Sequence, residues 1–386
     1  MSDVKKNPTK TNKKKPTIKH LSTSFGVGCF HFGIKKNPPY NYSIERYIKE
    51  LKKLLKTISS IKNIKITHFG QTNKKKIEKI QKNFPEIDKG VGYFPHIDSL
   101  SIEFEVHIPQ RIQEEISGRN FEKTENFAIS INYNFDFPTT IIEATSPLPN
   151  ENFSSSVVIV REFLRNEIKK IGSNFIKFEC LGPSPIHANF FIKPKKLKKN
   201  QKIKIEITKK LSYNKIVIFY NQAEISFKEA KKIVYFKINI QADFFYYLAS
   251  VRARLIHKWV TISSLVDNYT TKINKKTFSG FWSQLFFPNK EINNITMLLA
   301  EFEMDEIHTK DLIRERKDHI FFDEQENILQ DSCEEEIKNY YCYPTKQIKE
   351  LLSLFYNQSS RIFDNFIVIT AAIIGGAIGA LITLLF

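Results

Sequence analysis

Residues 99–109 read SLSIEFEVHIP, and this stretch decides the fold class of the larger part of the chain. Apolar and polar residues alternate along it, which is the pattern of a β-strand with one buried face and one solvent-exposed face. Residues 125–137, ENFAISINYNFDF, repeat the alternation. Two half-buried strands of this kind predict an antiparallel sheet that is covered on one face.

Helical patterns flank these strands. Apolar residues recur every three or four positions over residues 42–60, between predicted strands at 25–34 and 61–69. Ser154 to Ser156 are predicted to cap a second helix, which continues through Ile171 and is closed by Gly172. The sequence therefore predicts an α+β fold, with mainly antiparallel sheet and flanking helices.

More strands and a long helix follow. Strands are predicted at 175–182 and 188–194, around the turn Gly182-Pro183-Ser184-Pro185, and then at 202–208, 215–220 and 232–240. The period changes at Asp243, a predicted N-cap, after which apolar residues step by three or four as far as Val266. From 278 to 365 the pattern is mainly helical, which predicts a helical stalk.

The C-terminal residues 366–386 read FIVITAAIIGGAIGALITLLF and contain no charged side chain. As a helix they would be about 31 Å long, the thickness of a bilayer core, so we expect a transmembrane helix. Small residues form two neighbouring columns at helical spacing, which favours self-association of this span. These residues are Ala371, Ala372, Gly375, Gly376, Gly379 and Ala380.

The N-terminal residues 1–20 are rich in Lys, Thr, Asn and Pro, which predicts a disordered basic arm. No apolar segment follows the basic start, so we expect no secretory signal peptide. We therefore expect a tail-anchored, single-pass protein whose N-terminal bulk is cytoplasmic, in the inner membrane of a bacterium.

The predicted domains follow from these patterns. They are a basic arm over 1–20, a cytosolic α+β domain over 21–240, a mainly helical region over 241–364 and a transmembrane anchor over 365–386. A further break within the α+β domain is expected near residue 195, where a run of lysines begins.

The formal net charge is +18, but 49 of the 59 basic residues are lysine. Such a Lys-rich, Gly-poor composition is typical of an AT-rich genome, so the charge is weak evidence for nucleic-acid binding. The basic stretch 195–210 contains no aromatic residue on which a base could stack. Nucleic acid therefore stays an alternative partner, and a solvated pair of strands or a face toward anionic headgroups is preferred.

No motif indicates a cofactor or a metal. The four cysteines have no disulfide framework, and His308, His319, Cys333 and Cys342 are too widely spaced for a compact zinc site. Phosphate-loop, nucleophile-elbow and HExxH motifs are absent. The one candidate pocket in the soluble region is formed by Glu179, Cys180 and His187, which flank the 182–185 turn.

Two functions remain. The first is a non-enzymatic membrane protein that binds a protein or small-molecule signal, self-associates through its span and acts on the membrane in stress or defence. The alternative is a membrane-tethered enzyme or nucleic-acid-binding module with its site in the 100–195 sheet.

Overall fold

The computed structural model describes residues 22–35, 44–68, 100–118, 124–133, 137–144, 154–180, 188–210, 213–274, 288–321, 327–338 and 343–385. The predicted basic arm at 1–20 lies outside these residues. The chain divides into two compact units. The first is built from the described residues of Met1–Phe69, Leu100–Asn132 and Thr139–Phe236, and the second from those of Tyr133–Pro138 and Lys237–Phe386.

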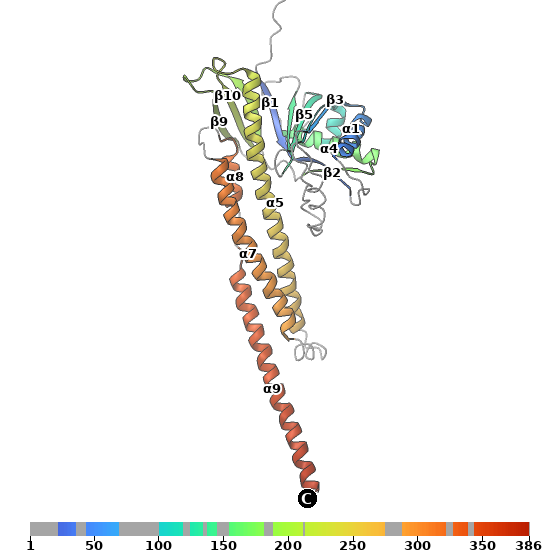
Figure 1. Cartoon of the computed structure of the whole chain (residues 1–386), viewed down its shortest axis with the longest axis vertical. Coiled ribbons are helices and arrows are strands. Elements are labelled where there is room, and N and C mark those ends of the chain that lie inside the picture. Colours follow the sequence, from blue (N-terminus) through green and yellow to red (C-terminus); the bar gives the residue numbers. More distant parts are fainter. Residues whose placement is uncertain are drawn as a thin grey trace, which may run out of the picture. The chain divides into compact units, whose positions relative to one another are not determined.

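The first unit is organised around an eight-stranded sheet with the strand order β3-β4-β5-β6-β1-β8-β10-β9 (Figure 1). The strands are β1 (Thr23–Gly28), β3 (Ile61–His68), β4 (Leu100–His107), β5 (Asn126–Tyr133), β6 (Thr139–Ala144), β8 (Ala188–Pro194), β9 (Ile203–Lys210) and β10 (Tyr213–Tyr220). β10 and β8 pair in parallel, whereas β1–β6, β1–β8, β3–β4, β5–β6 and β9–β10 are antiparallel. The predicted α+β class with a mainly antiparallel sheet is confirmed.

A two-stranded sheet joins β2 (Phe30–Ile34) to β7 (Ile176–Cys180). The predicted single strand at 25–34 is divided at Cys29, where the chain passes from the large sheet to the small one. The backbone N–H of Phe30 donates to Oγ1 of Thr140 at 3.0 Å, which anchors this crossing. The strand is thus interrupted because β1 pairs with strands of the large sheet, whereas β2 pairs with β7.

Helices pack on both faces of the large sheet, but on one of the faces they cover only part of the strands. α1 (Ile44–Thr57) and α4 (Ser154–Ile171) pack on one face. α4 approaches β1 closely at Gly28, where an added Cβ atom would lie 3.0 Å from the side chain of Val157. The first turns of α5 cover the other face, where the Tyr235 ring lies 5.1 Å from Phe25. Two elements in this unit, β6 and the short α3 (Gln110–Ser117), were not predicted.

The predicted strand at 232–240 is wrong, because α5 is one helix from Phe227 to Asn274. Ser226 caps it: its backbone N–H donates to Glu229 at 2.9 Å, and the Glu229 N–H donates back to Oγ of Ser226. This is a capping box, which satisfies N–H groups that the helix itself leaves unpaired. Asp243 is therefore an interior residue rather than the predicted N-cap, and its carboxylate accepts from the backbone N–H of Phe137 at 2.8 Å.

The second unit is a helical stalk, as predicted. α5 from Lys237, α7 (Pro288–Ile320) and α9 (Thr345–Leu385) share an apolar core, with the short α8 (Gln330–Lys338) beside them (Figure 1). The rings of Trp259, Phe302 and Tyr343, one from α5, one from α7 and one just before α9, lie within 5.6 Å of one another. Lys349 of α9 pairs with Glu303 of α7 at 2.6 Å.

α9 continues beyond this core as a regular helix. Of the predicted transmembrane segment 366–386, the side chains that the structure describes are those of Phe366–Gly375. Within the described part of the chain, no helix is long and apolar enough to cross a membrane. The expected C-terminal transmembrane helix is thus not found there.

Candidate functional site

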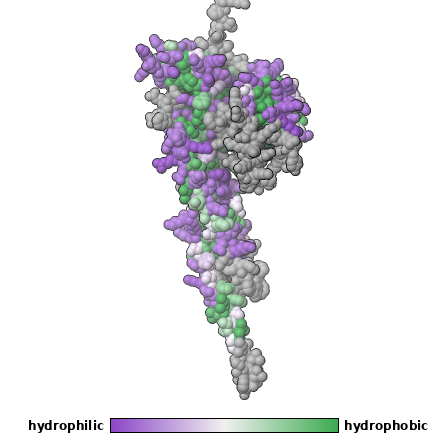
Figure 2. Space-filling view, viewed as in Figure 1, coloured by the Kyte–Doolittle hydropathy of each residue, from purple (hydrophilic) through white to green (hydrophobic). Residues whose placement is uncertain are grey.

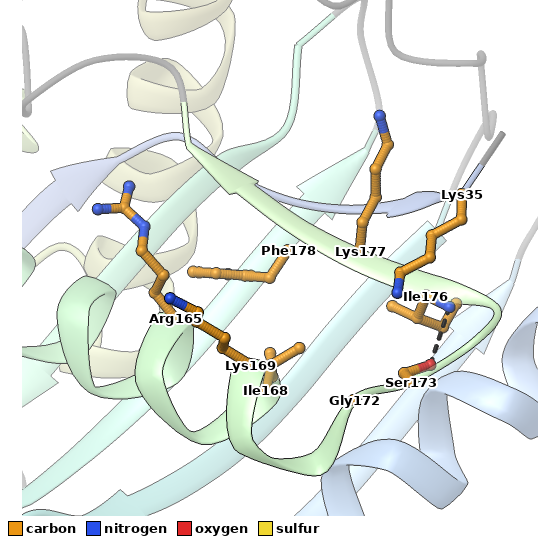
Figure 3. A pocket seen from close by; sticks show the side chains of 9 residues that line it. All are labelled: Lys35, Arg165, Ile168, Lys169, Gly172, Ser173, Ile176, Lys177 and Phe178. Atoms are coloured by element: carbon orange, nitrogen blue, oxygen red, sulfur yellow. Dashed lines mark hydrogen bonds between the residues drawn. The ribbon is translucent and has the colours of Figure 1, made fainter.

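The candidate site is a pocket in the first unit, between the end of α4 and the small sheet (Figure 3). Its volume is about 250 Å³. Residues from the end of β2, the last two turns of α4 and β7 line it: Lys35, Arg165, Ile168, Lys169, Gly172, Ser173, Ile176, Lys177 and Phe178.

α4 supplies one wall because its lining residues share a helical face. Arg165, Ile168, Lys169 and Gly172 are separated by three, one and three positions, so they recur along one side of the last two turns. The helix ends at Gly172, whose φ of 67° suits glycine, and the Gly172 N–H donates to the carbonyl of Ile168 at 3.1 Å.

A tight turn then leads directly into β7. Oγ of Ser173 accepts from the backbone N–H groups of Phe175 and Ile176 at 3.3 and 3.0 Å. Ile176 and Phe178 therefore follow the helix closely and point back toward it, whereas Lys177 leaves β7 on the opposite side from Phe178 (Figure 3). The floor of the pocket is apolar, formed by Ile168, Ile176 and Phe178.

The rim of the pocket is cationic. Arg165 is paired with Glu162 at 2.8 Å, and Lys177 with Glu179 at 2.8 Å. Among the described residues, no carboxylate forms an ion pair with Lys35 or Lys169. These two ammonium groups are available to an anion, so the pocket suits a small molecule with an apolar body and a negatively charged group.

Two of the three predicted pocket residues lie on β7, next to this site. Glu179 and Cys180 end β7, where they pair in register with His31 and Phe30. Because they are neighbours on a strand, their side chains point to opposite faces. His187 lies outside the described residues, so the predicted grouping of the three stays a prediction.

Cys180 is not poised as a nucleophile. Burial raises the pKa of its thiol to about 12, although the guanidinium groups of Arg165 and Arg161 act in the opposite direction. The thiol is therefore protonated at neutral pH, and the thiolate is the reactive form. Arg165 also lines the pocket, so Cys180 lies beside it without contributing reactive chemistry.

His31 is buried on the other face of the small sheet. Burial lowers its pKa to about 3, and the nearby ammonium of Lys177 contributes in the same direction. A Cβ at Gly33 would lie 2.9 Å from Nε2 of His31, so the glycine leaves room for the ring. With so low a pKa, this imidazole is too weak a base for catalysis near neutral pH.

The described residues contain no group of three or more His, Cys, Asp or Glu side chains that could hold a metal ion. His308 and His319 lie on α7, and Cys333 is buried in α8. Cys342 lies outside the described residues.

The sequence patterns predicted β7, but they did not indicate that Arg165 and Lys169 of α4 line the pocket. The signal that could have found it is the helical spacing of Arg165 and Lys169 near the end of α4, an end that was predicted correctly at Ile171. We compared the chain with protein-family models, with curated proteins and with solved structures, and none of them matches it.

Proposed function

We propose that the protein is a membrane-anchored binding protein. In this proposal the apolar end of α9 inserts into a bilayer, and the pocket beside α4 binds a small amphipathic anion as a signal. The observation that carries the proposal is the exposed apolar surface of α9 beyond the helical core. The membrane partner, the location of the protein and its self-association are parts of this proposal.

The exposed residues of α9 surround the helix. Ile367, Val368 and Ile369 are 49%, 66% and 59% exposed, and because they are consecutive they point about 100° apart. Ile373 and Ile374 repeat the pattern one turn later, at 65% and 54% exposed. A partner helix would cover one face only, whereas lipid covers all of them, so this distribution favours a bilayer.

The length of the apolar run also fits a bilayer. The sequence continues without a charged residue to Phe386, which gives 21 residues and about 31 Å of helix. Figure 2 shows the same change along α9, where hydrophilic surface gives way to apolar and pale surface toward the last described residues. The nearest charged residues, Arg361 and Asp364, come before this run.

The class of ligand follows from the pocket. Phe178, Ile168 and Ile176 offer apolar contact, and the ammonium groups of Lys35 and Lys169 offer charge. A cavity of about 250 Å³ is at the small end of ligand sites, so the ligand is a small molecule such as an aromatic carboxylate or a nucleoside monophosphate. A membrane-tethered enzyme is the alternative, but neither the Cys180 thiol nor His31 supplies a nucleophile or base at neutral pH.

A thermal-shift experiment tests the ligand class. The full chain in neutral detergent is screened with aromatic carboxylates, aromatic sulfonates and nucleoside monophosphates. A ligand at about 100 times its Kd stabilises the folded state by about 2.7 kcal/mol, which raises Tm by several degrees. The Lys35→Gln/Lys169→Gln variant should lose this shift, whereas the matched Lys52→Gln/Lys56→Gln variant on α1 should keep it.

If no compound of the three classes raises Tm, or if the pocket variant keeps the full shift, the pocket is not the ligand site. The anchor is tested separately by carbonate extraction of bacterial membranes. Ile373→Asp/Ile374→Asp should move the protein to the soluble fraction, since an acid costs about 2.5–3.5 kcal/mol at the centre of a span and these two positions lie close to the centre of 366–386. Leu354→Asp, at an equally exposed site before the span, should stay in the membrane.

A further inference from the structure

We propose that the outer face of β8, β10 and β9 binds single-stranded nucleic acid, mainly through its phosphates. This face, called the basic face below, is formed by the residues that alternate with Ile216, Ile218 and Tyr220 and with their neighbours in register, together with Lys195 just after β8. Its charged and aromatic residues are Phe191, Lys193, Lys195, Lys204, Glu206, Lys215 and Phe219. Phe191 is only 6% exposed, whereas Phe219 is half-buried.

The strand register brings these residues together from distant parts of the sequence. Lys193 of β8 and Lys204 of β9 are both partners of Phe219 on β10, so one row across the sheet reads Lys–Phe–Lys. Neighbouring strands are about 4.8 Å apart, which places the three side chains within about 10 Å. The alternate residues Ile216, Ile218 and Tyr220 are buried on the opposite face.

The lysines are held over the aromatic rings. The Lys195 ammonium lies 4.2 Å from the centroid of the Phe219 ring. Those of Lys193 and Lys215 lie 5.5 and 5.4 Å from the centroid of Phe191. Because Phe191 is buried, Phe219 is the ring of this face that a base can reach, and the Lys195 ammonium beside it places charge where the phosphate would bind.

The basic face contains few acidic residues. In the described residues of β8, β9 and β10, the only carboxylate is Glu206, which Lys195 and Lys204 contact at 3.1 and 2.9 Å. Hydrogen bonds from these two lysines lower the pKa of Glu206, so it stays ionised. The segment that leads from β8 to β9 adds exposed positive charge at Lys196, Lys198 and Lys199, and Figure 2 shows hydrophilic surface over β9 and β10.

The half-buried ring of Phe219 favours single-stranded nucleic acid over a lipid surface. Anionic headgroups attract lysines, but they have nothing to stack on a half-buried ring such as Phe219. Unpaired bases stack on aromatic side chains, and their phosphates bind the surrounding lysines. The face has no arginine that could read a base edge in a bidentate manner, so we expect binding that tolerates any sequence.

The experiment measures the anisotropy of a fluorescent oligothymidylate of about 16 nucleotides, a length within the site sizes of such proteins. The full chain is used in neutral detergent over a range of salt concentrations. The Lys193→Gln/Lys215→Gln variant should weaken binding and reduce the slope of log K against log salt by about 1.4, since each phosphate contact on a single strand contributes about 0.7. Phe219→Leu should weaken binding about tenfold through loss of stacking, with the slope unchanged.

The matched control is Lys52→Gln/Lys56→Gln on α1, which removes the same charge from an exposed helix of the same unit and should bind like the parent protein. The proposal is overturned if the oligothymidylate does not bind, or if the control variant weakens binding as much as the variant of the basic face. It is also overturned if Phe219→Leu has no effect while dextran sulfate competes equally well, which would indicate a general polyanion surface. Binding only to vesicles with anionic lipid would assign the face to a membrane instead.

Discussion

Gln241 provides the sharpest test of how the second unit is held together. Its side chain is only 3% exposed, and its Oε1 accepts hydrogen bonds from the backbone N–H groups of Ile328 and Leu329, both at 2.9 Å. These two N–H groups immediately precede α8, so Gln241 of α5 satisfies them from 87 and 88 positions away. The backbone carbonyl of Gln241 also faces the thiol of Cys333 at 3.9 Å.

The test is Gln241→Leu, which keeps a similar volume and removes the acceptor. Two buried N–H groups then lose their partner, at about 1–3 kcal/mol each, so the attachment of α8 should weaken by about 2–6 kcal/mol. Hydrogen exchange of the amides in 327–338, measured by mass spectrometry in neutral detergent, should accelerate by a factor between about 30 and on the order of 10,000. Gln347→Leu on the exposed side of α9 is the control and should leave exchange unchanged. Equal exchange in both variants would refute this account of α8.

Three further predictions concern buried groups and the span. The pKa of His31 is lowered from 6.5 to about 3 in the folded state, so the unfolded chain binds more protons than the folded chain between these pH values. The free energy of unfolding should therefore fall as the pH drops from about 6.5 toward 3. In urea unfolding, the His31→Gln variant should lack this part of the pH dependence. Burial raises the pKa of the Cys180 thiol to about 12. At pH 8 this thiol should therefore react with iodoacetamide at least about a hundredfold more slowly in the folded chain than in the unfolded chain, as measured by peptide mass spectrometry. Equal rates would contradict its burial. A Cβ added at Gly375 meets nothing within 4 Å, so the Gly375→Ile variant should keep its helical content. If the columns of small residues mediate self-association, energy transfer between labelled chains in micelles should be lower for this variant than for the parent protein. Unchanged energy transfer would exclude that interface.

Local patterns predicted most elements of the first unit. The end of α4 at Ile171 was predicted as observed, because Gly172 follows it with a positive φ. Ser154 to Ser156, which were predicted to cap this helix, are its first three residues. The alternation at 99–109 and 125–137 correctly predicted β4 and β5. In each case the signal lies within the element itself, as a period or as a residue that begins or ends it.

The errors occurred where local signals compete. Residues 232–240 are rich in Ile, Val, Tyr and Phe, which favour strands, yet they belong to α5. Ser226 and Glu229 have the spacing of a capping box and could have indicated the start of this helix. β6 was missed because its outer residues are also buried in the centre of the sheet, so it lacks the alternation of a half-exposed strand.

The sequence by itself determined the α+β class, the helical stalk and the apolar composition of the C-terminal residues, since each depends on the order of residues along one segment. Only the tertiary structure decided which side chains meet. The basic stretch after β8 contains no aromatic residue, but the fold places Phe219 of β10 next to its residues Lys195 and Lys204. The pocket likewise combines Lys35, the end of α4 and β7, which are up to 143 positions apart. Such contacts depend on sheet order and helix packing, which are properties of the whole fold and leave no periodic trace in a single segment.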